Sequence, residues 1–250
     1  MIYTPLSIFT TDICKAVIYL NHPQMIPIKL FKQLWQKAYP IAFVDGFANH
    51  IYNNNNIHDL RDNYLPNFLT GDFDSIEKEV LKFYYSKMNV SVIETLDQNE
   101  TDFTKCLRVI INYIEENNIN IDMITAVQMS GGRFDHEMAS IKTLYETRKL
   151  TSIPLILITE CCVIFLLDEG EHTIYANTGY EAEHIGLIPV GQSCQVTTKG
   201  LQWDLDNLTL SFHGIVSTSN RRISEIIQVK CDQPLIFTME YNSEKIICLE

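Results

Sequence analysis

The sequence predicts an α/β protein in which a mostly parallel sheet with flanking helices is followed by a C-terminal all-β sandwich. Short apolar runs alternate with helix-like segments over roughly the first 155 residues, and after about residue 160 only short strand-like runs remain. The length of 250 residues is sufficient for two hydrophobic cores. We therefore expect an α/β domain over residues 1–155 and a β-sandwich domain over residues 156–250.

The first part reads as strands that alternate with helices. The expected strands are Ala16–Leu20, Ile41–Val44, Phe68–Leu69, Val90–Ile93, Met123–Met129 and Ile153–Ile158. Apolar side chains recur at helical spacing in Ile76–Met88, Phe103–Ile114 and Phe134–Leu150. Strands joined by such helices are typical of a parallel sheet covered by helices.

The second part reads as an antiparallel sandwich or barrel. Its runs are rich in Val, Ile, Thr and aromatic residues, and glycines separate them. The expected strands are Cys161–Leu167, Glu171–Ala176, Gln192–Thr198, Asn207–Phe212, Ile226–Lys230 and Leu235–Met239.

The charge balance excludes some classes of partner. With 19 Lys and Arg against 31 Asp and Glu, the formal net charge is −12, which disfavours nucleic acid and anionic membrane surfaces. Seven cysteines without a C-x-x-C pair predict free thiols in a reducing compartment. The N-terminus has no basic region, and the longest apolar run, Ile153–Leu167, is too short and broken to span a bilayer. We expect a cytoplasmic protein.

Polar side chains follow successive expected strands at the edge where open parallel sheets bind their ligands. Asp45 ends one strand, Asp72 and Asp74 follow the next, and the polar run Asp97–Asp102 follows the third. Asp45, Asp74 and Thr101 also have an ordinary interpretation, because Asp and Thr are favoured as helix caps. Capping does not account for carboxylates at every one of these strand ends.

Asp72 and Asp74 are the strongest candidates for a metal site. They are two residues apart in a loop that we expect to be extended, so both carboxylates would point the same way. Two close like charges need a counter-charge, and a hard divalent cation with oxygen ligands supplies it.

A fourth segment, Ser130–Asp135, joins a strand to a helix through two glycines. Gly132 permits close approach of a ligand to the backbone, the helix N-terminus offers free N–H groups, and Arg133 adds a bidentate phosphate donor. An ordinary tight turn with a surface arginine is about as plausible for this segment alone. Together the four segments predict a divalent metal that handles a polyphosphate. No P-loop, G-x-G-x-x-G or H-E-x-x-H motif occurs.

Seven segments in order resemble the thiamine pyrophosphokinase family, and together they span nearly the whole chain. They are Asp45–Asn49, Gly71–Ser75, Thr101–Lys105, Gly132–Asp135, Gly186–Gly191, Thr197–Trp203 and Val216–Asn220. The resemblance implies a homodimer that transfers the pyrophosphate of ATP to the hydroxyethyl group of thiamine, giving thiamine diphosphate and AMP with Mg²⁺. It implies sites at the dimer interface.

Residue roles follow from the same resemblance. The metal set it implies is Asp45, Asp72, Asp74 and Asp102, with Asp72, Asp102 and Arg133 as catalytic residues. The ATP- and thiamine-binding residues it implies are Asp45, Gln98, Gly132, Asp135, Trp203, Ser217 and Asn220. Without the resemblance, Trp203 reads as a core residue of a hairpin.

Two departures from the family pattern concern the site. Phe47 stands where the family usually has a second glycine, which predicts a narrower nucleotide cleft, and His136 stands where it usually has glutamine. The residues after Asn220 also differ from the usual glycine-rich turn. Two alternative functions remain at this stage: a metal-dependent kinase or nucleotidyltransferase for another hydroxylated small molecule, and a non-catalytic thiamine or nucleotide sensor.

Overall fold

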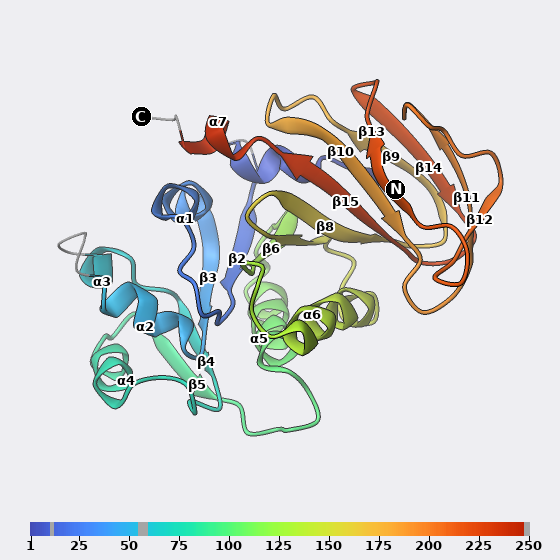
Figure 1. Cartoon of the computed structure of the whole chain (residues 1–250). Coiled ribbons are helices and arrows are strands. Elements are labelled where there is room, and N and C mark those ends of the chain that lie inside the picture. The colour runs from blue at the N-terminus through green and yellow to red at the C-terminus, as the bar shows by residue number, and fades with distance from the viewer. Residues whose placement is uncertain (11–12, 55–59, 248–250) are drawn as a thin grey trace. The chain divides into compact units, whose positions relative to one another are not determined.

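The computed structural model describes residues 1–10, 13–54 and 60–247 and divides the chain into two compact units (Figure 1). The α/β unit is Ile13–Leu155. The β-rich unit combines Met1–Asp12 with Ile156–Glu250. The α/β unit has helices beside a sheet, and the β-rich unit consists mainly of strands. This arrangement confirms the predicted mixed α/β class.

The α/β unit is built on five parallel strands in the order β6-β2-β3-β4-β5. Their bounds are β2 Lys15–Tyr19, β3 Ala38–Val44, β4 Phe68–Gly71, β5 Ser91–Glu94 and β6 Met123–Val127. The chain runs outward from β2 to β5 and then returns to the other side of β2 with β6. A topological switch point therefore lies between β2 and β6, where such sheets bind their ligands.

In the described part of the chain, five helices lie between these strands and a sixth follows β6. They are α1 Ile28–Trp35, α2 Phe47–Tyr52, α3 Leu60–Asn63, α4 Lys78–Tyr85, α5 Asp102–Glu116 and α6 Phe134–Thr147. The three predicted helices correspond to α4, α5 and α6, and α5 begins after Thr101, whose side chain accepts the Thr104 N–H at 3.2 Å. The sequence analysis missed the short helices α1 to α3. Among the described residues, no helix is long and apolar enough to cross a membrane.

The first residues of the chain belong to the β-rich unit, although the sequence analysis placed them in the α/β domain. Strand β1 (Ile2–Tyr3) pairs in parallel with β9 (Gly170–Tyr175). The 3-10 helix that follows, Pro5–Phe9, is buried, and the Phe9 ring lies 5.0 Å from that of Tyr241. These apolar side chains are buried against the β-rich unit, and sequence order alone does not reveal that contact.

Two groups of hydrogen-bonded strands make up the β-rich unit, in the orders β1-β9-β14-β11-β12 and β13-β10-β15-β8-β7. The bounds are β7 Leu155–Ile158, β8 Cys162–Leu167, β10 Glu181–Ile188, β11 Cys194–Lys199, β12 Leu208–Leu210, β13 Ser217–Arg221, β14 Ile226–Cys231 and β15 Leu235–Tyr241, and a short helix α7, Ser243–Ile247, follows. Apart from β1 with β9, the pairs within this unit are antiparallel.

Aromatic side chains form the core of the β-rich unit. Phe165 of β8 lies 5.2 Å from Phe237 of β15 and 5.0 Å from Tyr3 of β1, measured between ring centroids. Because Tyr3 belongs to one group of strands and Phe165 to the other, their contact joins the two groups. Burial along β8 alternates, as expected for a strand with one face in a core.

Candidate active site at the carboxyl edge of the parallel sheet

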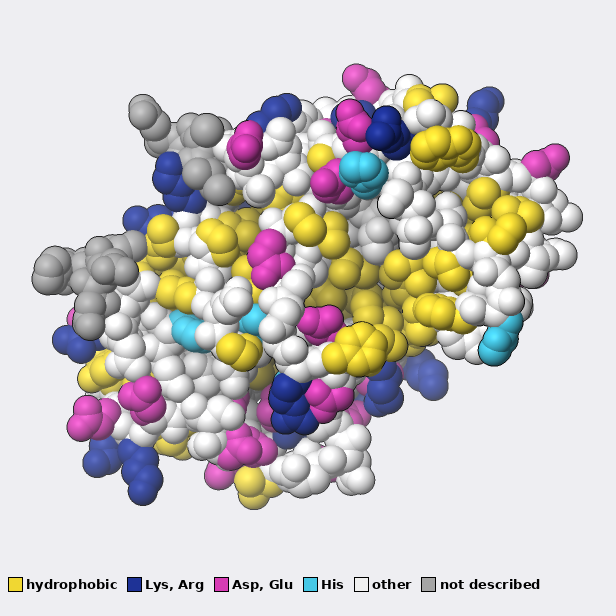
Figure 2. All heavy atoms as spheres, in the orientation of Figure 1, with side chains coloured by type: hydrophobic (Ala, Val, Ile, Leu, Met, Phe, Trp, Pro, Cys, Tyr) yellow, Lys and Arg dark blue, Asp and Glu magenta, His cyan; other side chains and the backbone are white. Residues whose placement is uncertain are grey.

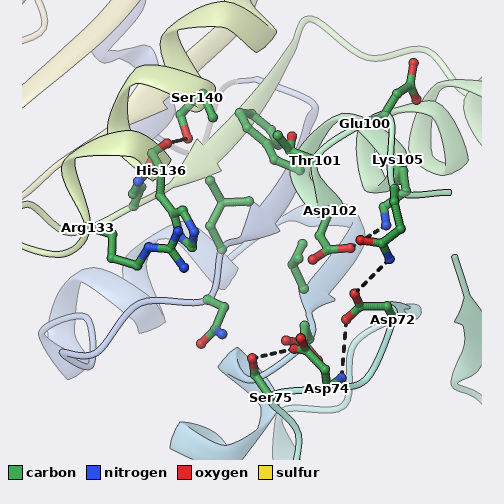
Figure 3. Close-up of a pocket in the computed structure, with 18 residues that line it drawn as sticks. Asp72, Asp74, Ser75, Glu100, Thr101, Asp102, Lys105, Arg133, His136 and Ser140 are labelled. Carbon is green, nitrogen blue, oxygen red and sulfur yellow. Dashed lines mark hydrogen bonds and ion pairs between the residues drawn. The ribbon is translucent and has the colours of Figure 1, made fainter. Parts of the chain in front are cut away.

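An open cavity of about 350 Å³ lies beyond the carboxyl ends of the parallel strands (Figure 3). Its charged lining residues are Asp45, Asp72, Asp74, Glu100, Asp102, Lys105 and Arg133, and Asn21, Ser75, Gln98 and Gln128 are among its polar ones. The lining is therefore strongly acidic. On the face seen in Figure 2, acidic side chains are scattered among basic and apolar ones.

Strand pairing places Asp45 in the cavity. The pairing of Val44 with Thr70 continues for one further residue, because the Asp45 N–H donates to the Thr70 carbonyl at 2.8 Å. Asp45 has a φ of 44°, a left-handed conformation that is uncommon outside glycine. A Cβ at Gly71 would lie 2.9 Å from the Asp45 Cβ, so only glycine allows β4 to approach this closely.

One oxygen of the buried Asp45 carboxyl group, Oδ1, lacks a hydrogen-bond partner among the described residues, and the residue is 3% exposed. Burial raises the pKa of Asp45, although hydrogen bonds with Ser75 and with the Gly46 backbone lower it in part. The charges of Asp74 and Asp102 raise it further. A strained residue with an unsatisfied buried oxygen is more typical of a ligand site than of a helix cap.

Asp72 and Asp74 converge through a turn and not through the extended loop that we expected. Phe73 between them has a φ of 61°, and the Asp74 N–H donates to Asp72 Oδ1 at 3.3 Å. Side-chain hydrogen bonds hold both carboxylates. Ser75 Oγ donates to Asp74 Oδ1 at 2.8 Å, and Gln98 Nε2 donates to Asp72 Oδ2 at 3.4 Å.

Asp45, Asp72 and Asp74 form a group with the chemistry of a divalent-metal site. Each offers a carboxylate oxygen, and these oxygens lie within 4.8 Å of one another. Hard oxygen donors and the unsatisfied Oδ1 of Asp45 fit Mg²⁺. Asp102 was predicted to join this set. It lines the same cavity, but its Oδ1 lies 2.8 Å from Lys105 Nζ.

The loop before α6 joins β6 to the helix through the two glycines, and a protein side chain, His22, lies beside Gly132 where we expected a ligand. Gly131 has a φ of 83°, and a Cβ at Gly132 would lie 2.7 Å from His22 Nε2. Arg133 and His136 line the acidic cavity and also a neighbouring one of about 420 Å³, to which Gly132 contributes. Asp135 is exposed and binds the Arg133 guanidinium, with its Oδ1 3.1 Å from Arg133 Nε. A ligand phosphate would have to compete with this carboxylate for Arg133.

The three residues predicted for the second domain cluster in the β-rich unit. Trp203 is 54% exposed, so it is not the core residue that composition alone suggested. The buried side chain of Asn220 forms hydrogen bonds with both backbone groups of Trp203. The Trp203 N–H donates to Asn220 Oδ1 at 3.2 Å, and Asn220 Nδ2 donates to the Trp203 carbonyl at 2.9 Å. Ser217 Oγ lies 3.4 Å from the same Nδ2. The Asn220 amide thus holds the Trp203 turn.

Phe47 does not narrow either cavity. Its side chain is buried and its ring stacks on Tyr19 with an interplanar angle of 17°. The cavity lining contains neither residue. In the segment after Asn220, Arg221 ends β13, and Arg222 Nε donates to the Ala182 carbonyl at 2.9 Å.

Sequence reasoning missed several residues that line this site, among them Asn21 and Lys105. Asn21 lies two residues after the end of β2, at the switch point, and lines both cavities. Its position at a strand end was the available signal. Lys105 lies three residues after Asp102 on α5, a spacing that is typical of a surface ion pair, yet its side chain is only 8% exposed.

Replacing Asp45 by Asn should stabilise the metal-free protein near neutral pH. Because the pKa of Asp45 is raised, the ionised carboxylate destabilises the folded protein. This destabilisation is absent below the ordinary pKa of Asp, where the group is protonated in both states. It grows as the pH rises and is complete above the folded-state pKa. Thermal unfolding with a chelator should show a higher melting temperature for Asp45→Asn at pH 7, and the gain should vanish towards acid pH. Asp62→Asn is the control, because Lys87 lowers the pKa of Asp62 and no gain is expected there. A pH-independent gain would contradict the ionic explanation.

A five-stranded parallel sheet with carboxylates at its carboxyl edge places the chain among α/β proteins that bind their ligands at such an edge. Residues 31–157 match the thiamin pyrophosphokinase catalytic domain, and residues 171–236 match the thiamin pyrophosphokinase vitamin B1 binding domain. The chain therefore belongs to the thiamine pyrophosphokinase family.

Individual relatives agree with this assignment. Thiamine pyrophosphokinase 1 of Oryza sativa subsp. japonica is 36% identical over 239 residues, covering 90% of this chain and 86% of the relative. The crystal structure of yeast thiamin pyrophosphokinase superimposes with a TM-score of 0.86 at 27% identity, covering 99% of this chain and 93% of the yeast chain. Thiamin pyrophosphokinase from Candida albicans gives a TM-score of 0.82 at 26% identity, covering 96% and 93%.

Proposed function

We propose that this protein transfers the pyrophosphate group of ATP to the hydroxyethyl oxygen of thiamine, giving thiamine diphosphate and AMP, in the cytoplasm and with Mg²⁺. The observation that carries the proposal is the group of Asp45, Asp72 and Asp74 at the ligand edge of the sheet, which includes a buried carboxylate oxygen without a partner. Family membership supports the choice of substrates.

Asp45, Asp72 and Asp74 would hold the metal ion, and Asp102 adds negative charge beside them. A bound Mg²⁺ would neutralise charge on the phosphates. Gln98 orients Asp72 through its hydrogen bond, and Arg133 binds phosphate oxygens in place of Asp135. These residues then act by positioning and charge stabilisation, which dominate phosphoryl-type transfer.

In the transfer step the thiamine hydroxyl oxygen forms a bond to the β-phosphorus of ATP. The bond between that phosphorus and the oxygen bridging to the α-phosphate breaks, and AMP leaves with the bond electrons. A carboxylate of the acidic cavity accepts the hydroxyl proton, and Asp102 is the residue we assign to this role. Its Oδ1 is fixed by Lys105 at 2.8 Å.

We assign thiamine binding to the β-rich unit, whose strands we interpret as a β-sandwich. The exposed Trp203 ring offers an aromatic face to the cationic thiazolium. Asn220 and Ser217 act through the Trp203 turn, because the Asn220 amide already bonds both backbone groups of Trp203. We further propose a homodimer in which each site combines the α/β unit of one subunit with the β-rich unit of the other.

The function is tested by incubating the protein with ATP, Mg²⁺ and thiamine and separating the nucleotide products. We expect AMP and thiamine diphosphate in equal amounts, and neither without thiamine. Formation of ADP would indicate an ordinary kinase for another substrate. Tight thiamine binding without turnover would indicate a sensor, and either result would refute the proposal.

Replacing Arg133 by Lys should not preserve ATP binding. Lysine keeps the charge but lacks the planar pair of donors that binds two phosphate oxygens, so we expect the KM for ATP to rise by about tenfold while the KM for thiamine stays unchanged. Arg148→Lys, at the opposite end of α6, is the matched control. An unchanged KM for ATP in Arg133→Lys would mean that Arg133 only pairs with Asp135 at the surface.

A further inference from the structure

Lys105 is a buried cation on the wall of the acidic cavity. It lies in the first turn of α5, and its side chain is only 8% exposed. Its Nζ donates to the Thr95 carbonyl at 2.7 Å and lies 2.8 Å from Asp102 Oδ1. The contact with Thr95 is a hydrogen bond, whereas that with Asp102 is an ion pair without hydrogen-bond geometry, since Asp102 Oδ1 has no hydrogen-bond partner among the described residues. One of the three N–H donors of the ammonium group is thus taken by the Thr95 carbonyl. Lys105 is also one of the residues that line the cavity.

The Thr95 carbonyl, which accepts the hydrogen bond from Lys105, lies where two neighbouring strands end. Thr95 directly follows β5, and its N–H donates to the Gly71 carbonyl at the end of β4 at 2.8 Å. Asp72 is the next residue after Gly71. The carbonyl that holds Lys105 is therefore tied to the loop that carries the metal-binding carboxylates, so the ammonium group is positioned before any ligand arrives.

The two basic residues of the cavity differ in character. The Arg133 side chain is 69% exposed and pairs with Asp135, which is also exposed. Lys105 is instead a fixed point charge among carboxylates inside the cavity. Figure 3 shows Asp72, Asp102 and Lys105 gathered at one side of the cavity and Arg133 with His136 at the other.

We propose that Lys105 binds an oxygen of the β- and γ-phosphates of ATP, the group that is transferred, through an N–H that does not bond the Thr95 carbonyl. The inference rests on the proposed function. A metal ion held by Asp45, Asp72 and Asp74 would neutralise charge on the β- and γ-phosphates. Because Lys105 lines the cavity that holds the candidate metal ligands, its cation lies on the side of these two phosphates and not of the adenosine. Its charge stabilises the negative charge of the transferring group.

The test is a nucleotide series measured by isothermal titration calorimetry with Mg²⁺. For Lys105→Met we expect affinity for a non-hydrolysable ATP analogue to fall by about 10- to 100-fold, as for a lost charge-assisted hydrogen bond. Affinity for AMP, which lacks both phosphates, should change by less than about twofold. Lys142→Met is the matched control, since Lys142 is an exposed lysine that pairs with Glu146 on α6, and all its affinities should stay unchanged.

A second variant guards against misfolding, since Lys105→Met leaves the Asp102 carboxylate without its partner. Comparing Asp102→Asn with the double variant Asp102→Asn, Lys105→Met removes the lysine without leaving that charge unpaired. The selective loss for the ATP analogue should persist in this comparison. An equal loss for AMP and the analogue, or no loss for either, would overturn the inference. Absence of AMP release by the wild-type protein would instead refute the proposed function.

Discussion

Asp72→Asn should reduce turnover by about 10³-fold, because it removes a charged ligand from the metal group without changing the size of the side chain. Asp72 contributes an oxygen to the group formed with Asp45 and Asp74, and it also accepts the Asp74 N–H that fixes the turn. The Asn side-chain oxygen can still accept that hydrogen bond. The loss should therefore appear in kcat and in the Mg²⁺ concentration needed for half-maximal rate, with the melting temperature little changed.

The matched control for Asp72→Asn is Asp62→Asn, an equally conservative change at a half-exposed surface carboxylate that pairs with Lys87. Release of AMP from ATP and thiamine is measured across a Mg²⁺ titration for both variants. The control should match the wild-type protein. Near-normal turnover of Asp72→Asn with an unchanged Mg²⁺ requirement would show that Asp72 is not a metal ligand.

Strands whose residues are all buried could be predicted from the sequence, and strands that mix buried and exposed polar residues could not. Strands β2 and β6 are buried at every position, so their apolar runs mark them plainly. Strand β10 contains Glu181, Glu183 and His184, which hide it from an apolar search. Every residue of strand β13 is polar, and only Asn220 in it is buried. Both strands are held by pairing with neighbours that are distant in sequence, and periodicity within one segment does not report such pairing.

The acidic part of the site could be predicted because one topological rule brings strand ends together. Asp45 and Asp72 follow adjacent strands, so their proximity depends only on the order of the parallel sheet. The geometry between them could not be predicted. It depends on left-handed conformations at Asp45 and Phe73 and on the absence of a side chain at Gly71. Residues other than glycine rarely adopt that conformation, and no local pattern in the sequence indicates it.

Residues that act through long-range contacts were beyond sequence reasoning. The resemblance assigned Asn220 to thiamine, yet its amide is engaged by the backbone of Trp203, 17 positions earlier in the sequence. Lys105 reads as the partner of Asp102 in a surface pair until its burial and its bond to Thr95 are known. In both cases the sequence identifies the kind of side chain, an amide or an ammonium group. Only the tertiary structure shows which group that side chain contacts.

Two inactive variants should restore activity to each other when mixed, because the proposed site combines residues of two subunits. Trp203→Ala should weaken thiamine binding by about 10- to 100-fold, the loss expected for an aromatic stacking surface, and Asp72→Asn should weaken the metal site and lower turnover by about 10³-fold. In a two-fold dimer with shared sites, a mixed dimer holds one site with both residues intact and one with neither. After random subunit exchange, half of the dimers are mixed, so activity at low thiamine should return to about one quarter of the wild-type value.

Exchange is verified with differently tagged subunits, and a mixture of two Asp72→Asn preparations is the control. Verified exchange without recovery would show that each subunit builds its site from its own two units.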